Sequence, residues 1–319
     1  MATNKNITMK QFNGTDYDTL YPKTIASQVD GLFLAQILVT TYPNTEVTAS
    51  LNGKTVSAMS DFSGLAILKI PSYGTWTVSA TISGVFVSTD YEIKVAAQYE
   101  LALSIDLETA NWDIIDSVSK SGKAAFVWSV GDKKTINIDG TNYQVQIIGF
   151  DHDTKTSGGK AGITFQLVDC LNRIYPMNNS NTNSGGWASC VMRNSYMATL
   201  LTQLPSALQN VIKAVNKLTS DGNQSATINT TSDKLFLLSE VEIFGSAIKS
   251  KSGEGSQYAY YKAGNSKVKK NGPDGSAMVW WERSPNGSNT MHFCSVSTDG
   301  GATISVPSES SGVAFGFCI

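Results

Sequence analysis

A run of short alternating segments separated by turns constrains the fold of this chain most strongly. Residues 46–51 alternate polar and apolar side chains and reach Asn52-Gly53, the dipeptide that most strongly favours a two-residue β-hairpin. Residues 65–70 and 75–82 show the same strand-like patterns and also end near turn-forming residues. About seven such strands follow one another closely, which is typical of a small β-sandwich. We therefore expect a β-sandwich over residues 31–108.

The residues before this run differ in character. Residues 1–30 are polar, and they form strands only by pairing with another element. We interpret them as a docking or oligomerisation segment.

Residues 109–319 combine strand and helix patterns, which predicts an α+β domain. Asp139-Gly140 predicts a hairpin within residues 135–148. Pro205 is followed by apolar residues at three- and four-residue spacing, which predicts an amphipathic helix to residue 218. Ser239 and Glu242 fit a capping box at the start of another helix. The apolar residues 312–319 predict a final strand. The whole chain is expected to be mainly β with an α+β C-terminal domain.

Charge and cysteine content exclude several classes of protein. The formal net charge is −2 with 16% charged residues, whereas nucleic-acid binding requires a basic surface. The four cysteines contain no Cys-x-x-Cys pair, so we expect no structural zinc site, although two disulfides remain possible. The first residues lack the apolar run of a signal peptide, and no apolar stretch is long enough to span a bilayer. We expect synthesis in the cytoplasm, with reduced thiols and no membrane insertion.

Motifs for catalysis are missing from the sequence. No Gly-x-Ser-x-Gly elbow occurs, and the chain has only two histidines, His152 and His292. Asp151-His152-Asp153 could hold a metal only if the backbone turned sharply, because neighbouring side chains on a strand point to opposite faces. The alternative is a turn stabilised by Asx-type hydrogen bonds. A pair of glycosidase carboxylates could come from distant residues, but no local pattern indicates one. We expect no enzyme activity, no cofactor and no metal.

An aromatic and polar run near the C-terminus is the best candidate for a binding surface. Tyrosine and tryptophan give a large contact area at low entropic cost, and serine, glycine and asparagine adapt their hydrogen bonds. His292 could be a plain surface residue or a ligand contact. We expect Trp280, Phe315 and Phe317 to belong to the core. The predicted ligand-binding residues are Tyr258, Tyr260, Tyr261, Trp281, Arg283, Asn286, Asn289 and His292.

A series of short segments in the C-terminal part of the chain carries a family resemblance. The segments are Gly186-Trp-Ala-Ser, Met192-Arg193, Leu204-Pro205, residues 234–240, Phe244-Gly245, Glu254-Gly, Gln257-Tyr, residues 280–285 and residues 312–318. Together they resemble an uncharacterised domain of phages and prophages of gut Firmicutes. That domain is distantly similar to the C-type-lectin and formylglycine-generating-enzyme-like fold, which also carries the variable proteins of diversity-generating retroelements. The signatures of a calcium-dependent lectin are absent, so the resemblance implies a binding scaffold.

Two weaker resemblances concern the rest of the chain. Two segments are similar to parts of immunoglobulin-like or prealbumin-like modules, which implies a spacer. They are Asn52-Gly-Lys-Thr-Val and Gly74-Thr-Trp-Thr-Val-Ser-Ala. The opening Met1-Ala-Thr-Asn-Lys and Tyr21-Pro-Lys-Thr24 are similar to the starts of phage tail-fibre and baseplate proteins.

Together these resemblances imply a virion protein of a phage tail or tail-like particle with three parts. Residues 1–30 would dock onto other tail or baseplate subunits as part of a homotrimer, and residues 31–108 would form the spacer. Residues 109–319 would form a C-type-lectin-like domain that recognises a glycan or protein on the host surface. The alternatives are a structural baseplate or decoration protein without receptor binding, and a glycan-degrading enzyme of the same particle.

Overall fold

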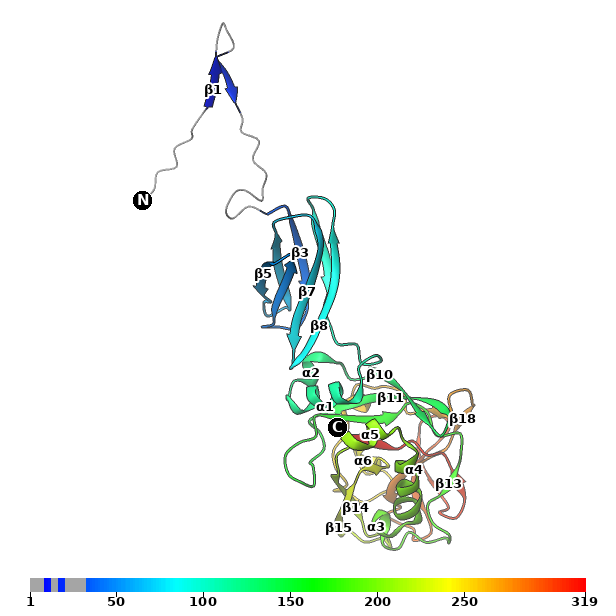
Figure 1. The fold of residues 1–319 in the computed structure, drawn as a ribbon. Helices are drawn as coiled ribbons and strands as arrows, with labels where there is room; N and C mark the ends of the chain where they lie inside the picture. The colour runs from blue at the N-terminus through cyan, green and yellow to red at the C-terminus, as the bar shows by residue number, and fades with distance from the viewer. Residues whose placement is uncertain (1–8, 13–16, 21–32) are drawn as a thin grey trace. The chain divides into compact units, whose positions relative to one another are not determined.

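The computed structural model describes residues 9–12, 17–20 and 33–319. Strands hold 40% of the residues and helices 16%, which confirms a mainly β protein. The chain divides into two compact units (Figure 1), the first made of Met1–Ile82 and Phe86–Ser104 and the second of Ser83–Val85 and Ile105–Ile319. Within the described residues, every helix is too short or too polar to cross a bilayer.

Strands β1 (Met9–Phe12) and β2 (Tyr17–Leu20) pair as an antiparallel hairpin. The rest of the expected docking segment, residues 1–8, 13–16 and 21–30, lies outside the described residues.

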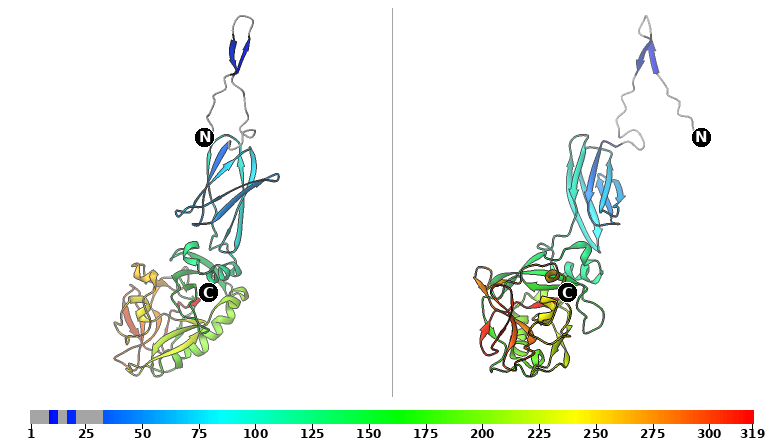
Figure 2. Two further views of the ribbon diagram at one scale, coloured as in Figure 1. Left: turned by 90° about the vertical axis from the view of Figure 1, so that its left-hand side faces the viewer. Right: turned by 180° about the vertical axis from the view of Figure 1, so that it is seen from behind.

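Seven further strands form two sheets in the first unit (Figure 2). One sheet has the order β6-β3-β9, in which β3 and β9 run parallel, and the other has the order β5-β4-β7-β8. The expected number of strands is therefore confirmed. Their bounds are β3 Ala35–Thr40, β4 Glu46–Leu51, β5 Lys54–Met59, β6 Leu65–Ile70, β7 Gly74–Ile82, β8 Val85–Ile93 and β9 Gln98–Ala102.

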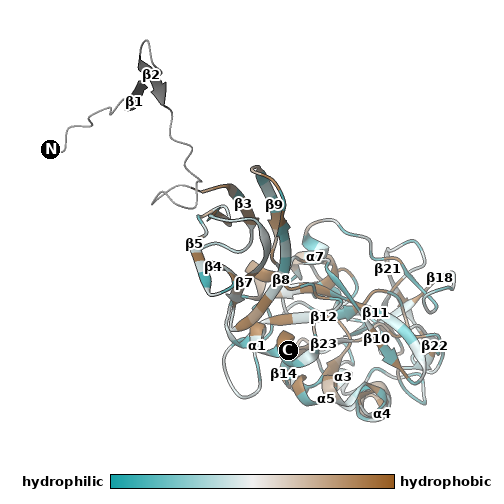
Figure 3. Cartoon of the chain, turned by 45° about the horizontal axis from the view of Figure 1, so that its top comes forward, coloured by the Kyte–Doolittle hydropathy of each residue, from teal (hydrophilic) through white to brown (hydrophobic). Residues whose placement is uncertain are grey.

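The predicted Asn52-Gly53 turn explains a hairpin of this unit, and the predicted alternation of polar and apolar residues explains its buried core. Asn52 and Gly53 have φ values of +49° and +79°, and Leu51 pairs with Lys54 in a two-residue hairpin. Polar and apolar residues alternate along the strands (Figure 3), so one side of each sheet is buried. The indole of Trp76 is completely buried in the core that results.

A five-stranded antiparallel sheet forms the centre of the second unit, in the order β10-β11-β12-β23-β16. The predicted final strand is β23, and it pairs on one side with β12 and on the other with β16. The hairpin predicted at Asp139-Gly140 joins β10 and β11. The bounds are β10 Lys133–Ile138, β11 Thr141–Phe150, β12 Ile163–Leu167, β16 Leu235–Phe236 and β23 Gly316–Cys318.

Short helices and small sheets surround this sheet. Helix α1 begins after Asn111, whose side chain accepts a hydrogen bond from the backbone N–H of Ile114. The helices are α1 Trp112–Lys120, α2 Ala124–Val127, α3 Gly186–Ser189, the π-helix η2 Met192–Met197, α4 Ala198–Gln203, α5 Ser206–Val211, α6 Glu240–Phe244 and α7 Ala259–Lys262. The remaining strands are β13 Tyr175–Pro176, β14 Val215–Ser220, β15 Ile228–Asp233, β17 Lys269–Lys270, β18 Ala277–Met278, β19 Trp280–Pro285, β20 Phe293–Val296, β21 Ala302–Ser305 and β22 Ser310–Ser311.

The long helix predicted from Pro205 to residue 218 is wrong in its second half. Helix α5 ends at Val211, and the chain continues as strand β14 from Val215. Val215, Lys217 and Thr219 are buried at a spacing of two residues, which is the period of a strand. The ammonium group of Lys217 has ion-pair partners in the core, so tertiary contacts override the local helical spacing.

The central position of β23 predicts a large stability effect for Phe317→Ala. The Phe317 ring is completely buried and stacks on Phe165 at a centroid distance of 5.3 Å. We expect this truncation to lower the free energy of unfolding by about 3–5 kcal/mol. Urea unfolding followed by tryptophan fluorescence measures the effect, because five of the six tryptophans lie in the second unit.

Phe126→Ala is the matched control, because the Phe126 side chain is 67% exposed in the same unit. It should change stability by less than about 0.5 kcal/mol. Equal effects of the two substitutions would contradict the placement of β23.

Candidate functional site

Strand β19 carries a bulge that places three polar side chains in the core. Trp281 pairs with Ser295 and Pro285 pairs with Phe293, so three residues of β19 oppose the single residue Cys294 of β20. A bulge changes the direction in which successive side chains point. The three bulge residues, Glu282, Arg283 and Ser284, are all completely buried.

The guanidinium group of Arg283 is fully satisfied inside the protein. It donates to both carboxylate oxygens of Glu242, with Nη1–Oε2 and Nη2–Oε1 distances of 2.5 and 2.9 Å. It also donates to the backbone carbonyls of Leu218, Leu237 and Glu254. The paired geometry with a carboxylate is the strongest arrangement that arginine makes. Arg283 therefore ties β19 to α6 and to the segments around β14 and β16.

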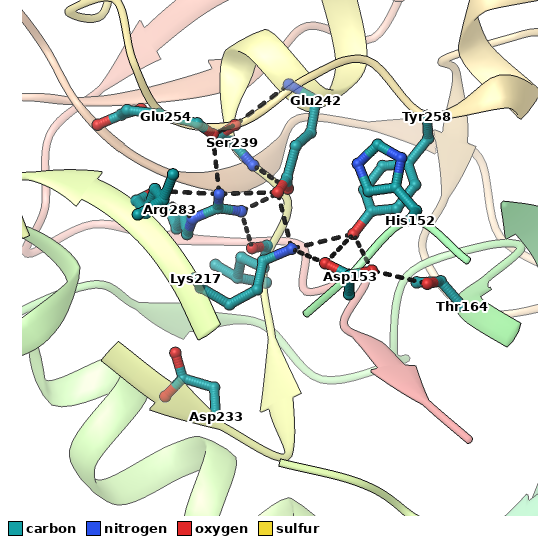
Figure 4. Close-up of polar contacts among 12 residues, drawn as sticks. His152, Asp153, Thr164, Lys217, Asp233, Ser239, Glu242, Glu254, Tyr258 and Arg283 are labelled. Atoms are coloured by element: carbon teal, nitrogen blue, oxygen red, sulfur yellow. Dashed lines mark hydrogen bonds and ion pairs between the residues drawn. The ribbon is translucent and has the colours of Figure 1, made fainter. Parts of the chain in front are cut away.

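Lys217 extends this ion pair into a network (Figure 4). Its Nζ lies 2.7 Å from a carboxylate oxygen of Asp153, 2.7 Å from Glu242 Oε1 and 3.0 Å from the Tyr258 hydroxyl. The same ammonium group lies 4.1 Å from the centroid of the Phe236 ring, as in a cation–π contact. The network thus contains two carboxylates and two cations, and all four side chains are almost completely buried. They are Asp153, Glu242, Lys217 and Arg283.

Both carboxylates stay ionised in this environment. Burial by itself would raise the pKa of Asp153, but the charge and hydrogen bond of Lys217, with a hydrogen bond from Thr164, hold this pKa well below its usual value. Burial also opposes ionisation of Glu242, and the charges of Arg283 and Lys217 overcome it, so the pKa of Glu242 is lowered.

His152 lies at the edge of the network. Its ring stacks on Tyr258 at a centroid distance of 4.1 Å, and burial lowers its pKa. Asp151 is exposed with φ +47°, whereas Asp153 is buried beside Lys217. Asp151 and Asp153 therefore lie in different environments. The Asp153 carboxylate binds the side chains of Lys217, Tyr258 and Thr164, and not a backbone N–H of the Asx-type turn that was the alternative to a metal site.

Glu254 and Ser239 complete the buried polar core. Glu254 accepts hydrogen bonds from the backbone N–H of Ser220 and from the hydroxyl of Ser284, while burial raises its pKa. Ser239 forms the predicted capping box with Glu242, and its hydroxyl donates to the backbone carbonyl of Glu254. One side chain, Glu242, therefore caps a helix and binds both buried cations.

A group of loops lies at the end of β19 and β20 where the loop 286–292 joins these two strands. We call it the polar loop face; it consists of residues 181–184, 221–225, 248–251 and 286–292. The completely buried Asn183 donates to the carbonyls of Asn286, Asn289 and His292, and accepts from the backbone N–H of Asn223. Gly287 N–H donates to the Lys249 carbonyl at 2.7 Å. The four loops are therefore connected by hydrogen bonds, while Met291 remains 50% exposed.

Five of the eight predicted ligand-binding residues are not on a surface. The hydroxyl of Tyr258 contacts Asp153, the hydroxyl of Tyr261 donates to Gln166, and the Trp281 indole donates to the carbonyl of Tyr175. Tyr258, Tyr261, Trp281, Arg283 and Asn286 are all at most 3% exposed. Their expected exposure is wrong, because each polar group has a partner inside the protein.

The other three predicted residues are partly exposed. Asn289 and His292 belong to the polar loop face, and Tyr260 lies on α7, with its ring edge-to-face against Tyr261. Trp280, Phe315 and Phe317 are completely buried, which confirms their assignment to the core. All four cysteines are buried free thiols.

The fold and this network define a β-rich protein whose second unit has an ionic core. The family model of a domain of unknown function, DUF6273, matches residues 161–319, which include the whole network except His152 and Asp153. A search of curated proteins gives no match.

One solved structure that aligns with the chain is the crystal structure of a Coh3ScaB–XDoc_M2ScaA complex, a C-terminal interface mutant of a type II cohesin–X-dockerin complex from Acetivibrio cellulolyticus. The identity is 22% and the TM-score is 0.18, over 21% of this chain and 51% of that one. The chain thus spans about half the length of that protein, and a TM-score this low supports no structural argument.

Removing the buried guanidinium should destabilise the second unit strongly. We expect Arg283→Met to lower the free energy of unfolding by about 3–5 kcal/mol, because Glu242 loses its main partner in the core. Arg173→Met is the matched control, since Arg173 and Asp139 form an ion pair with both side chains more than half exposed. The control should cost less than about 1 kcal/mol. Urea unfolding measures both, and equal costs would contradict a structural role for Arg283.

The lowered pKa of Asp153 predicts a loss of stability in acid. A carboxylate with a lowered folded-state pKa stabilises the fold above its unfolded pKa of 3.8, and this contribution is lost as the pH falls through the folded value. Between pH 5 and pH 3, wild type should lose about 1 kcal/mol more than Asp153→Asn, which lacks this titration. Urea unfolding at the two pH values tests this, and equal losses would show that Asp153 has an ordinary pKa.

Proposed function

We propose that this chain is a non-enzymatic subunit of a phage tail or tail-like particle, and that its second unit binds a ligand on the host surface. The polar loop face is the observation that carries this proposal. In this proposal the first unit is an immunoglobulin-like spacer and the second is a C-type-lectin-like recognition domain. Residues 1–30 dock onto other tail subunits, and the chain assembles as a homotrimer in the virion.

Preorganisation of the polar loop face supports a binding role. Asn183 fixes residues 286–292 and 223 through hydrogen bonds of its buried side chain, so ordering these loops on a ligand costs little entropy. The loop 286–292 consists mainly of asparagine, serine, glycine and threonine, together with Met291 and His292. Such side chains suit adaptable hydrogen bonding around a few apolar contacts.

The position of the carboxylates favours binding over glycan hydrolysis. Glycosidases need two carboxyl groups that flank a substrate. The carboxylates that the structure brings together, those of Asp153, Glu240, Glu242, Glu254 and Glu282, are at most 5% exposed. They are enclosed within the protein, where a polysaccharide cannot reach them.

The ligand contacts that we propose are the exposed parts of the polar loop face, with Asn289, Met291 and His292 at its centre. His292 is half-buried, and its Nδ1 is itself buried without a hydrogen-bond partner among the described residues, so only the exposed part of the ring can contact a ligand. Tyr258, Trp281 and Arg283 have a different role, because their side chains belong to the buried core of the second unit.

Cell binding tests the proposal. The full chain, biotinylated and made multivalent on fluorescent streptavidin, is incubated with a panel of Gram-positive gut bacteria. We expect saturable binding to particular strains, strengthened by avidity. Absence of binding to every strain by folded protein would overturn the receptor-binding role and favour a structural baseplate or decoration protein. Release of reducing sugar from the cell envelope would instead indicate a glycan-degrading enzyme.

Substitutions separate the polar loop face from the rest of the second unit. Met291→Ala combined with His292→Ala should weaken cell binding at least about tenfold, with an unchanged circular dichroism spectrum. Asn265→Ala combined with Val268→Ala is the control, because Val268 is 38% exposed and lies beside Gly300, beyond the other end of β20. An equal loss in both double variants, or no loss in the first, would contradict this site.

A further inference from the structure

A second cluster of buried side chains, separate from the Arg283 network, includes the first residue of the β19 bulge. Glu240 is the first residue of α6, Glu282 is the first bulge residue, and Cys294 is the single residue of β20 opposite the bulge. One carboxylate oxygen of each glutamate and the Cys294 sulfur all lie within 4.8 Å of one another. All three side chains are completely buried. The bulge therefore directs an acidic side chain toward a thiol and a second carboxylate.

Glu282 is the unexplained member of this cluster. Neither of its carboxylate oxygens has a hydrogen-bond partner among the described residues. Burying a carboxyl group without partners is costly, so the group needs either a proton or a cation. Burial, followed by the negative charges of Glu240 and Glu254, raises the pKa of Glu282 well above its usual value. A bound cation would remove this cost and ionise the group.

Glu240 is oriented so that one of its oxygens remains available. Its Oε2 accepts hydrogen bonds from the backbone N–H groups of Ile248, Lys249 and Ser250 and from the Ser250 hydroxyl. Its Oε1 accepts only from Lys249 N–H, at 2.9 Å. A carboxylate oxygen has two lone pairs, so Oε1 can still bind a cation. The loop 248–250 thus fixes the carboxylate and stabilises its charge.

We propose that Glu240, Glu282 and Cys294 bind a zinc ion. Zinc binds both thiolate sulfur and carboxylate oxygen, whereas calcium and magnesium select oxygen ligands alone. On binding, zinc replaces the protons held by Glu282 and by the Cys294 thiol, and both protons leave to solvent. The metal joins α6, β19 and β20 next to the loops 248–251 and 286–292. This site does not depend on what the polar loop face binds.

Metal content of the full chain tests the site. Protein expressed in zinc-supplemented medium and purified without a metal-affinity tag should contain about one zinc per chain by inductively coupled plasma mass spectrometry. Glu282→Gln and Cys294→Ser should each reduce this content at least about tenfold. Cys190→Ser is the matched control, because Cys190 is also a buried free thiol but lies outside the cluster, and it should retain the zinc.

The absorption spectrum of the cobalt-loaded wild-type chain tests the same site, and this test does not depend on whether any variant folds. Protein refolded with Co²⁺ should show a thiolate-to-cobalt charge-transfer band, and added zinc should abolish it. Zinc below about 0.1 per chain together with no cobalt band would overturn the proposal and leave Glu282 as a buried neutral acid. Retention of zinc in both Glu282→Gln and Cys294→Ser would overturn it as well, because the ion would then lie elsewhere.

Discussion

The ion pair between Arg283 and Glu242 is the interaction on which the second unit depends. It lies where α6, β14 and β19 meet, and its two oxygens and three nitrogens use almost all of their hydrogen-bonding capacity. An apolar core of similar volume could be equally stable, but it would not require one particular arrangement of these segments. A buried guanidinium has few acceptable environments, since every donor needs an acceptor. We therefore expect the network to contribute more to defining a single arrangement of these segments than to net stability.

The bulge in β19 explains how so many polar groups enter one core. A regular strand would send Glu282 and Ser284 to one side and Arg283 to the other, with one partner residue opposite each. With the bulge, these three residues together oppose the single residue Cys294 in the strand pairing. Glu282 then faces Glu240, Arg283 faces Glu242, and Ser284 bridges the Glu240 backbone and the Glu254 carboxylate. Because Glu240 also binds the loop 248–250, the same bulge is linked to the loops at the surface.

The sequence predicts local features of this protein well and long-range polar contacts poorly. The strands of residues 33–105, the turn at Asn52-Gly53 and the capping box of Ser239 follow from neighbouring residues and a fixed period. The Tyr258–Asp153 contact joins residues 105 positions apart, and the Lys217–Asp153 contact joins residues 64 positions apart, so no local pattern reveals them. Tyrosine and tryptophan also suit a binding surface and a polar core equally well, which explains the error at Tyr261 and Trp281. Asn183, which organises the polar loop face, has no distinctive sequence context at all.

The position of β23 has a consequence for synthesis on the ribosome. Thr164 of β12 pairs with Cys318 of β23, so these neighbours in the sheet are 154 residues apart in the chain. Strands β10, β11 and β12 leave the ribosome early, and the edge of β12 stays unpaired until residue 318 has been translated. An unpaired strand edge can pair with other nascent chains. The second unit therefore has a long interval during translation in which the edge of β12 can form wrong pairings.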